Sequence, residues 1–135
     1  MGIDRIASPV DVAVSGLKAE SLRLNVVANN IANASTTRTA GGGPFRRQTV
    51  AVTADPRGLS GVTVQQVQAD MSTDFKRILD PGDPSADADG YVLMPNVDLP
   101  VEMIQMVMAS RAYQANAAVL KKYQEMVDVA LEALR

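Results

Sequence analysis

Carboxylates are the only side chains whose spacing in this chain suggests metal binding or catalysis. Four aspartates fall within one short acidic segment: Asp80, Asp83, Asp87 and Asp89. A calcium loop over this segment would begin at Ser85 and place a glycine correctly at Gly90. Its twelfth position, which needs a bidentate Glu, is Asn96, and its first position lacks a carboxylate. We therefore predict a solvated acidic turn and no bound metal.

The remaining kinds of catalytic site lack their essential residues. There is no His, so a histidine base and the usual catalytic triads are excluded, and with no Cys either, zinc has no ligand set. Gly41-Gly42-Gly43 is not followed by the Lys-Ser/Thr of a phosphate-binding loop. Arg46-Arg47 is interpreted as a solvated strand face in preference to an anion site. We expect no cofactor, no small-molecule substrate and no enzymatic activity.

Amide side chains are the more informative polar residues. Asn25, Asn29 and Asn33 are spaced four apart, and Gln114 and Asn116 lie in the middle of the C-terminal segment. Asn has a low helix propensity and is unfavourable on a helix face that only contacts solvent. An amide beside an apolar seam can instead fix the register of packed helices. A solvated helix surface and a register-setting contact both remain open.

The N-terminal segment has the pattern of a helix over about residues 10–34. Ser8-Pro9 supplies an N-cap and a proline suited to the first turn, and the asparagines predict fraying near Ala34-Ser35. Gly16 indicates either simple tolerance or close approach of a neighbouring backbone. Apolar or small residues occupy heptad positions, with one interruption at Glu20: Val10, Ala13, Leu17, Leu24, Val27 and Ile31.

The C-terminal segment predicts a longer helix that begins near Asp98-Leu99-Pro100 and meets no Gly or Pro afterwards. Its main stripe is Val101, Ile104, Met108, Ala112, Ala115, Val119, Met126, Ala130 and Ala133. A neighbouring stripe widens the apolar face: Leu120, Val127, Leu131 and Leu134. Because neither terminal helix can bury its stripe alone, we expect the two to pair as a coiled-coil-like antiparallel hairpin and to pack with neighbouring copies.

The centre of the chain collects the residues that break helices: seven of the nine glycines and five of the seven prolines. Residues 46–53 and 62–67 alternate as strands and predict a hairpin around Asp55-Pro56-Arg57-Gly58, with Val67 one place out of register. Residues 70–79 can add a third short strand. The predicted fold class is α+β, with segments 1–34 (helix), 35–98 (β-rich insert) and 99–135 (helix).

Composition agrees with a structural protein of one domain. Apolar residues make up 47% of the 135 residues but aromatic ones only 4%, which suits helix seams better than a thick core. The net charge of −2 gives no reason to expect nucleic acid or an anionic membrane as a partner. Asp4 and Asp11 interrupt any apolar signal core, so no cleaved signal peptide is expected.

Several separated motifs resemble one family. Ser15–Glu20 with Ala28–Ala34 is similar to the N-terminal signature of bacterial flagellar rod and hook proteins, and Ser110–Asn116 to their C-terminal motif. The central motifs narrow the resemblance to basal-body rod proteins of the proximal rod: Gly42–Gln48, Asp80–Pro84, Asp87–Val92 and Pro95–Val97. Residues 70–79 and Asp98-Leu99-Pro100 depart from the family pattern, which affects local loop shape.

The resemblance implies a structural subunit of the helical rod that crosses the periplasm. It also implies export through the flagellar type III apparatus without signal cleavage, and partners that are other rod proteins and copies of the same chain. The resemblance further implies terminal helices that are poorly ordered in the free subunit and become ordered on assembly. The alternatives are another rod subunit or a cytosolic coiled-coil export adaptor or chaperone. Candidate subunit contacts are Leu17, Leu24, Asn29, Ile31, Asn33, Met108, Tyr113, Gln114, Asn116, Val119 and Met126.

Overall fold

The structure is a computed structural model that describes residues 8–56 and 61–135. Two long helices at the ends of the chain enclose four short strands in sequence. The elements are α1 (Pro9–Ala32), β1 (Gln48–Ala54), β2 (Val62–Ala69), β3 (Lys76–Leu79), β4 (Tyr91–Met94) and α2 (Leu99–Glu132). Both sheets are two-stranded and antiparallel, β1 with β2 and β3 with β4. The predicted α+β class, with terminal helices around a β-rich centre, is confirmed.

Local capping residues fix where the helices begin, as predicted. The Ser8 hydroxyl accepts a hydrogen bond from the Val10 amide, and the Asp11 carboxylate accepts one from the Ser8 amide, which completes a capping box. The Asp98 carboxylate accepts from the Val101 amide at the start of α2. At its other end α1 stops at Ala32, two residues before the predicted fraying point.

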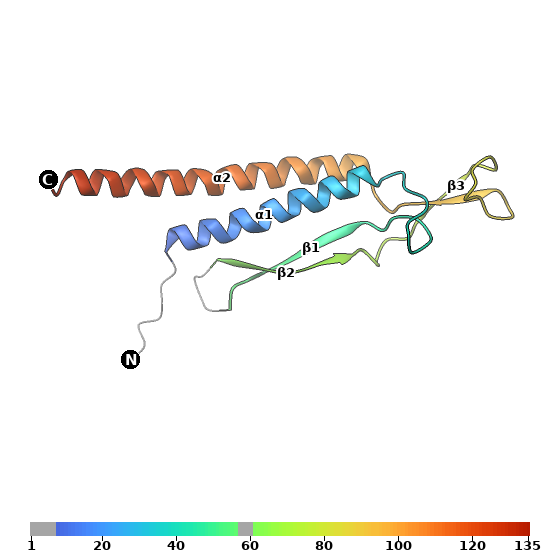
Figure 1. Cartoon of the computed structure of the whole chain (residues 1–135), viewed down its shortest axis with the longest axis horizontal. Helices are drawn as coiled ribbons and strands as arrows, with labels where there is room; N and C mark the ends of the chain where they lie inside the picture. Colours follow the sequence, from blue (N-terminus) through green and yellow to red (C-terminus); the bar gives the residue numbers. More distant parts are fainter. Residues whose placement is uncertain (1–7, 57–60) are drawn as a thin grey trace.

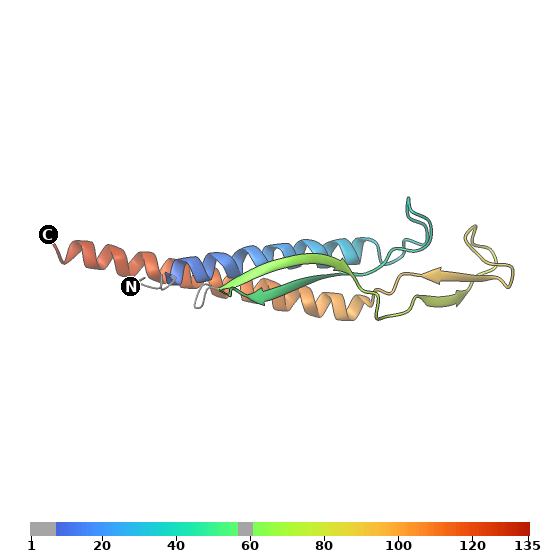
Figure 2. The same cartoon turned by 90° about the horizontal axis from the view of Figure 1, so that it is seen from below.

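The two helices lie side by side and antiparallel (Figures 1 and 2). Gly16 faces Asn116, and Asn30 is hydrogen-bonded to Glu102, so Pro9 is level with about Tyr123. Since α1 has 24 residues and α2 has 34, the last residues of α2 continue past the first turn of α1, as Figure 1 shows.

The first hairpin, β1–β2, lies along α1 on the side away from α2 in Figure 1 and contacts α1 through both strands. Its pairing runs from Gln48↔Ala69 to Ala54↔Val62, with a register shift between Ala51 and Val52 that leaves Gln65 unmatched. This bulge explains why Val67 breaks the alternation of the sequence. The predicted hairpin is confirmed, although residues 57 and 58 of its predicted turn lie outside the described residues.

The second hairpin, β3–β4, projects beyond the helix pair, at the end opposite the start of α1 and the end of α2 (Figures 1 and 2). The third strand predicted within residues 70–79 forms over Lys76–Leu79. Its partner β4 follows the acidic turn, closed by Gly90 at φ +79°, and was not predicted. Among the elements described, neither strand packs against a helix or the first hairpin.

The helix interface differs from the predicted pairing of stripes. On α1, Ala13 and Val27 are buried as expected, but Leu17, Leu24 and Ile31 are only half-buried. Other core residues of α1, Ala19 and Val26, lie off the predicted heptad positions, because the β1–β2 hairpin covers a second side of the helix.

On α2 the predicted seam is wrong. The buried residues of α2 are Glu102 and Ala109, whereas Val101, Ile104 and Met108 of the predicted stripe are exposed. The stripe is rotated away from α1, and small or polar residues occupy the contact in its place. Heptad spacing identifies an apolar face, but it cannot tell whether that face meets the same chain or a neighbour.

Candidate functional site

Polar side chains gather where the two helices meet the strands. We call this cluster the polar junction and define it as Asn30, Arg47, Asp70, Asn96 and Glu102. Asn30, Asn96 and Glu102 are among the buried polar residues of the described chain. They come from the last turn of α1, from the segment before α2 and from the first turn of α2, so the junction joins elements that are distant in sequence.

Glu102 is the centre of the junction and is completely buried. Its Oε1 accepts a hydrogen bond from Arg47 Nε at 2.5 Å, and its Oε2 accepts one from Asn30 Nδ2 at 3.1 Å. A buried carboxylate is tolerated only when it is paired and hydrogen-bonded, and both conditions are met here. The ion pair therefore fixes α2 against the start of β1.

Asn30 connects α1 to the same strand. Its Oδ1 accepts from the Gln48 amide at 2.9 Å, and its Nδ2 also donates to the Gln48 carbonyl at 2.8 Å. The Asn30 amide thus pairs with a backbone peptide much as a neighbouring strand would. In the described chain every buried side-chain nitrogen or oxygen has a hydrogen-bond partner.

The predicted solvated strand face at Arg46-Arg47 is wrong. Both arginines are half-buried, and their guanidinium groups bind acceptors of the same chain. Arg47 also approaches the Asp70 carboxylate at 3.6 Å, while Arg46 donates to the backbone carbonyls of Asp70 and Thr73. The groups they recognise are internal, so these arginines do not form a free anion site.

Asp70 keeps its charge under strongly acidic conditions. Hydrogen bonds from the Ser72 hydroxyl and backbone amide, assisted by Thr73, lower the pKa of Asp70 to about 2. Donors directed at a carboxylate favour its charged form. Asp70 is therefore the ionised partner of Arg47 at neutral pH.

The acidic turn is organised by its own backbone. Asp87 Oδ1 accepts from the amides of Asp89 and Tyr91, and its Oδ2 accepts from Arg77 at 3.0 Å. The Tyr91 amide and then Arg77 lower the pKa of the Asp87 carboxyl. Within residues 8–56 and 61–135 no cluster of carboxylates could hold a metal ion.

The predicted contact amides have unequal environments. Asn33 caps α1: its Nδ2 donates to the Asn29 carbonyl and its Oδ1 accepts from Thr36. Asn29 is exposed, and its Nδ2 donates to the Gln48 side chain at 3.3 Å. Gln114 is exposed on α2. Their proposed contacts with neighbouring subunits stay a prediction.

Asn116 packs inside the subunit. A Cβ at Gly16 would lie 2.7–2.9 Å from the Asn116 side chain, whose Nδ2 donates to the Ala112 carbonyl. Of the two interpretations of Gly16, close approach is correct, but the neighbour is a side chain and not a backbone. Glycine at this position lets the two helices come together around the amide.

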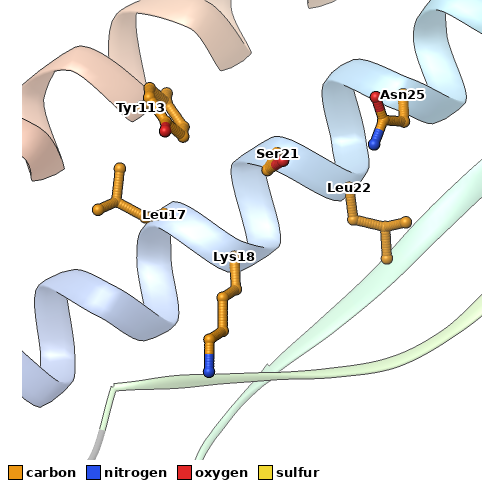
Figure 3. Close-up of a pocket in the computed structure, with 6 residues that line it drawn as sticks. All are labelled: Leu17, Lys18, Ser21, Leu22, Asn25 and Tyr113. Atoms are coloured by element: carbon orange, nitrogen blue, oxygen red, sulfur yellow. The ribbon is translucent and has the colours of Figure 1, made fainter.

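An open groove of about 390 Å³ lies along α1, with one residue of α2 at its edge (Figure 3). Leu17 points towards Tyr113 of α2 across one side of it, and both were predicted as contact residues. The other residues that line the groove are Lys18, Ser21, Leu22 and Asn25.

The second notable surface is an apolar line along α2. We call it the α2 stripe and define it as Val101, Ile104, Met108, Ala115, Val119 and Met126. All six are exposed, and the predicted contact residues Met108, Val119 and Met126 have exposed fractions of 60%, 47% and 63%. Large contiguous apolar exposure of this kind marks interaction sites. In the part of the chain that is described, neither helix is long and apolar enough to cross a bilayer.

Sequence reasoning missed the polar junction. Its partners are separated by 55 residues for Arg47 with Glu102 and by 72 for Asn30 with Glu102, so no local spacing reveals them. One usable signal was Glu102 itself, a lone carboxylate among apolar residues in the first turns of a helix. Another was Asn30, an unfavourable helix residue next to the amide strip.

Comparison with known proteins agrees with the motifs. The C-terminal family of flagellar basal-body rod FlgEFG proteins matches residues 88–133, and the flagella basal body rod protein family matches residues 11–38. The chain is 40% identical to the flagellar basal-body rod protein FlgC of Borreliella burgdorferi, with 95% of this chain and 97% of that protein covered. It is 42% identical to the FlgC of Salmonella typhimurium, covering 87% and 89%. The chain therefore belongs to the FlgC family of flagellar basal-body rod proteins, and it is a structural subunit of the proximal rod and not an enzyme.

Proposed function

We propose that this subunit assembles into the rod mainly through the α2 stripe, which packs against helices of neighbouring subunits. The observation that carries this proposal is the exposure of Met108, Val119 and Met126 on a helix whose other face already packs on α1. Full burial of such a side chain stabilises by about 1.5–3 kcal/mol, so burying the exposed half contributes roughly 1 kcal/mol per residue. Repeated along one helix, this supplies a substantial part of the driving force that association needs.

The neighbours in this proposal are other rod proteins and further copies of this chain. Contacts between different faces of successive subunits do not close into a ring, and they generate a helical tube. A second contact surface is supplied by the half-buried apolar residues of α1, Leu17, Leu24 and Ile31, together with Tyr113 at the groove. Asn29, Asn33 and Gln114 would then set register beside these apolar contacts.

The same proposal includes a route to the periplasm. The subunit is exported by the flagellar export apparatus without a cleaved signal peptide and joins the rod there. Membership of a family of flagellar basal-body rod proteins is what supports this route.

Introducing a charge on the stripe tests the proposal. Val119→Asp and Met108→Asp should leave secretion of the subunit unchanged and sharply reduce the number of completed basal bodies, because an unpaired charge in an apolar contact costs several kcal/mol. The measurements are the amount of secreted subunit and the count of basal bodies in the same cells.

The matched control is Lys121→Asp, a charge change at an exposed position of α2 outside the stripe. It should assemble better than either stripe variant. Normal rods in cells that carry Val119→Asp would show that the stripe is not a subunit contact, and retention of the variant in the cytosol would argue against a role confined to assembly.

A further inference from the structure

The β3–β4 hairpin is separated from the rest of the subunit. It projects beyond the helix pair in both views (Figures 1 and 2), and among the described elements its strands pack only against each other. Two connecting segments, residues 70–75 and 95–98, join it to β2 and α2. A hairpin that contacts no described helix and no other described strand, with two unrestrained connectors, would swing relative to the helices.

The connectors, however, are bonded to each other. Asn96 is buried, and its Nδ2 donates to the carbonyls of Asp70 at 3.2 Å and Thr73 at 3.1 Å. Its Oδ1 accepts from the Arg47 amide at 2.8 Å. One side chain therefore ties together the incoming connector, the outgoing connector and the segment before β1.

Arg46 joins the segment before β1 to the incoming connector. Its Nη1 donates to the carbonyls of Asp70 and Thr73 at 3.0 and 3.2 Å, and its guanidinium lies over the Phe75 ring, 4.1 Å from the centroid. Lys76 Nζ, at the start of β3, adds a bond to the Val97 carbonyl of the outgoing connector at 3.2 Å. Every one of these bonds opposes rotation of the hairpin about its connectors.

We propose that Asn96, Arg46 and Arg47 are positioning residues of a rigid joint that holds the β3–β4 hairpin at one angle to the helix pair. Arg47 anchors this joint in the body of the subunit, because its side chain is paired with the buried Glu102 of α2. The inference concerns the shape of a single subunit. It therefore does not depend on which surfaces meet in the rod.

A rigid joint has a consequence for binding. The hairpin carries exposed apolar residues, with Ile78 48%, Leu79 61% and Leu93 46% exposed. A fixed angle keeps these residues at a set distance from the α2 stripe. Two surfaces that are held in place before contact lose less conformational freedom on association, so a neighbour can bind both at lower cost.

The joint can be tested on the purified free subunit by dipolar spectroscopy between two spin labels. The chain has no Cys, so labels at Leu79→Cys on β3 and Lys121→Cys on α2 are unique, and both positions are exposed. We expect a single narrow distance distribution for the labelled parent. A broad distribution in a sample whose helices are folded by circular dichroism would overturn the proposal at once.

Two variants in the labelled background test the named bonds. Asn96→Asp keeps an acceptor for the Arg47 amide and removes both donors to Asp70 and Thr73, while Arg46→Met removes the guanidinium and keeps an apolar stem over Phe75. Each should broaden the distribution and shift its maximum. Arg46→Lys retains a charged donor and should fall between Arg46→Met and the parent.

Arg23→Met is the matched control, because it removes an arginine that is bonded to Glu20 on α1, outside the joint. Its distribution should equal that of the parent. Circular dichroism identifies any variant that fails to fold. If Asn96→Asp does not fold, the half-exposed Arg46 variants decide the question. Folded joint variants with the distribution of the parent would overturn the proposal.

Discussion

The polar junction lies inside the subunit and the α2 stripe lies on its surface, although the junction is built of charged and amide side chains and the stripe of Val, Ile, Met and Ala. Glu102 and Asn30 are fully buried, while Met108 and Met126 of the same helix pair are more than half exposed. This arrangement is the reverse of an ordinary globular core, where large apolar residues fill the interior.

The difference separates two physical roles. Buried polar groups that are all hydrogen-bonded accept few alternative arrangements, so the junction fixes the geometry of helices and strands and adds little net stability over an apolar core. Exposed apolar side chains keep the hydrophobic driving force available until a neighbour covers them. In the proposed assembly, one region specifies the shape of the subunit and the other provides the energy of association.

The largest effect on the free subunit is expected for Glu102→Ala. It leaves the half-buried Arg47 without its closest carboxylate and Asn30 without one acceptor, and breaking such a pair costs about 3–5 kcal/mol of unfolding free energy. Urea denaturation measures the loss. Glu125→Ala removes the same residue type from an exposed pair with Lys122 and should stay within about 0.5 kcal/mol. Equal effects of the two substitutions would contradict the central place of Glu102.

A smaller effect is expected at the helix contact. Gly16→Ala adds a methyl group 2.7–2.9 Å from the Asn116 side chain, so this side chain must leave its bond to the Ala112 carbonyl or the helices must separate, and overpacking of this kind costs about 1–3 kcal/mol. This exceeds the gain of up to about 1 kcal/mol in helix propensity. Asn116→Ala in the same chain should remove the clash and recover the lost stability. A double-mutant cycle with no coupling would refute this close contact.

The smallest effect is expected from acid. Asp70 and Asp87 have lowered pKa values in the folded subunit, Asp70 to about 2 from an ordinary value of 3.8. Their charged forms are favoured by folding, so this contribution is fully present above about pH 4 and is lost as the pH falls towards 2. Unfolding free energy measured against pH should decline over that range. Asp70→Asn should weaken the decline; an unchanged curve would show that Asp70 does not cause it.

The parts of the fold that depend on neighbouring residues could be predicted from the sequence. Ser8 and Asp98 mark the helix starts because a cap and its amide lie within three residues. The β1–β2 hairpin follows from alternation, and the misplaced Val67 reflects the bulge at Gln65 in the same strand. Strand β4 was missed because four residues after an acidic turn carry too little pattern.

The parts that depend on distant residues could not be predicted. The α2 stripe was identified correctly as an apolar face, but its partner was not, since Met108 has the same spacing whether it meets α1 or another subunit. Arg47 resembled an ordinary strand arginine because its carboxylate belongs to a helix that begins about fifty residues later. Recognition of the family needed only the motifs, whereas the geometry of the junction needed the fold.

Chemical protection shows directly whether the α2 stripe is exposed in the free subunit and covered by neighbours in the rod. Single cysteines at Val119→Cys and Met126→Cys are the only thiols in their chains, and their reaction with a maleimide can be compared in the free subunit and in purified basal bodies. We expect rapid labelling of both positions in the free subunit and strong protection in the rod. Protection should be weaker at Lys121→Cys, which lies on another face of α2. Equal labelling of the stripe positions in both states would contradict this expectation.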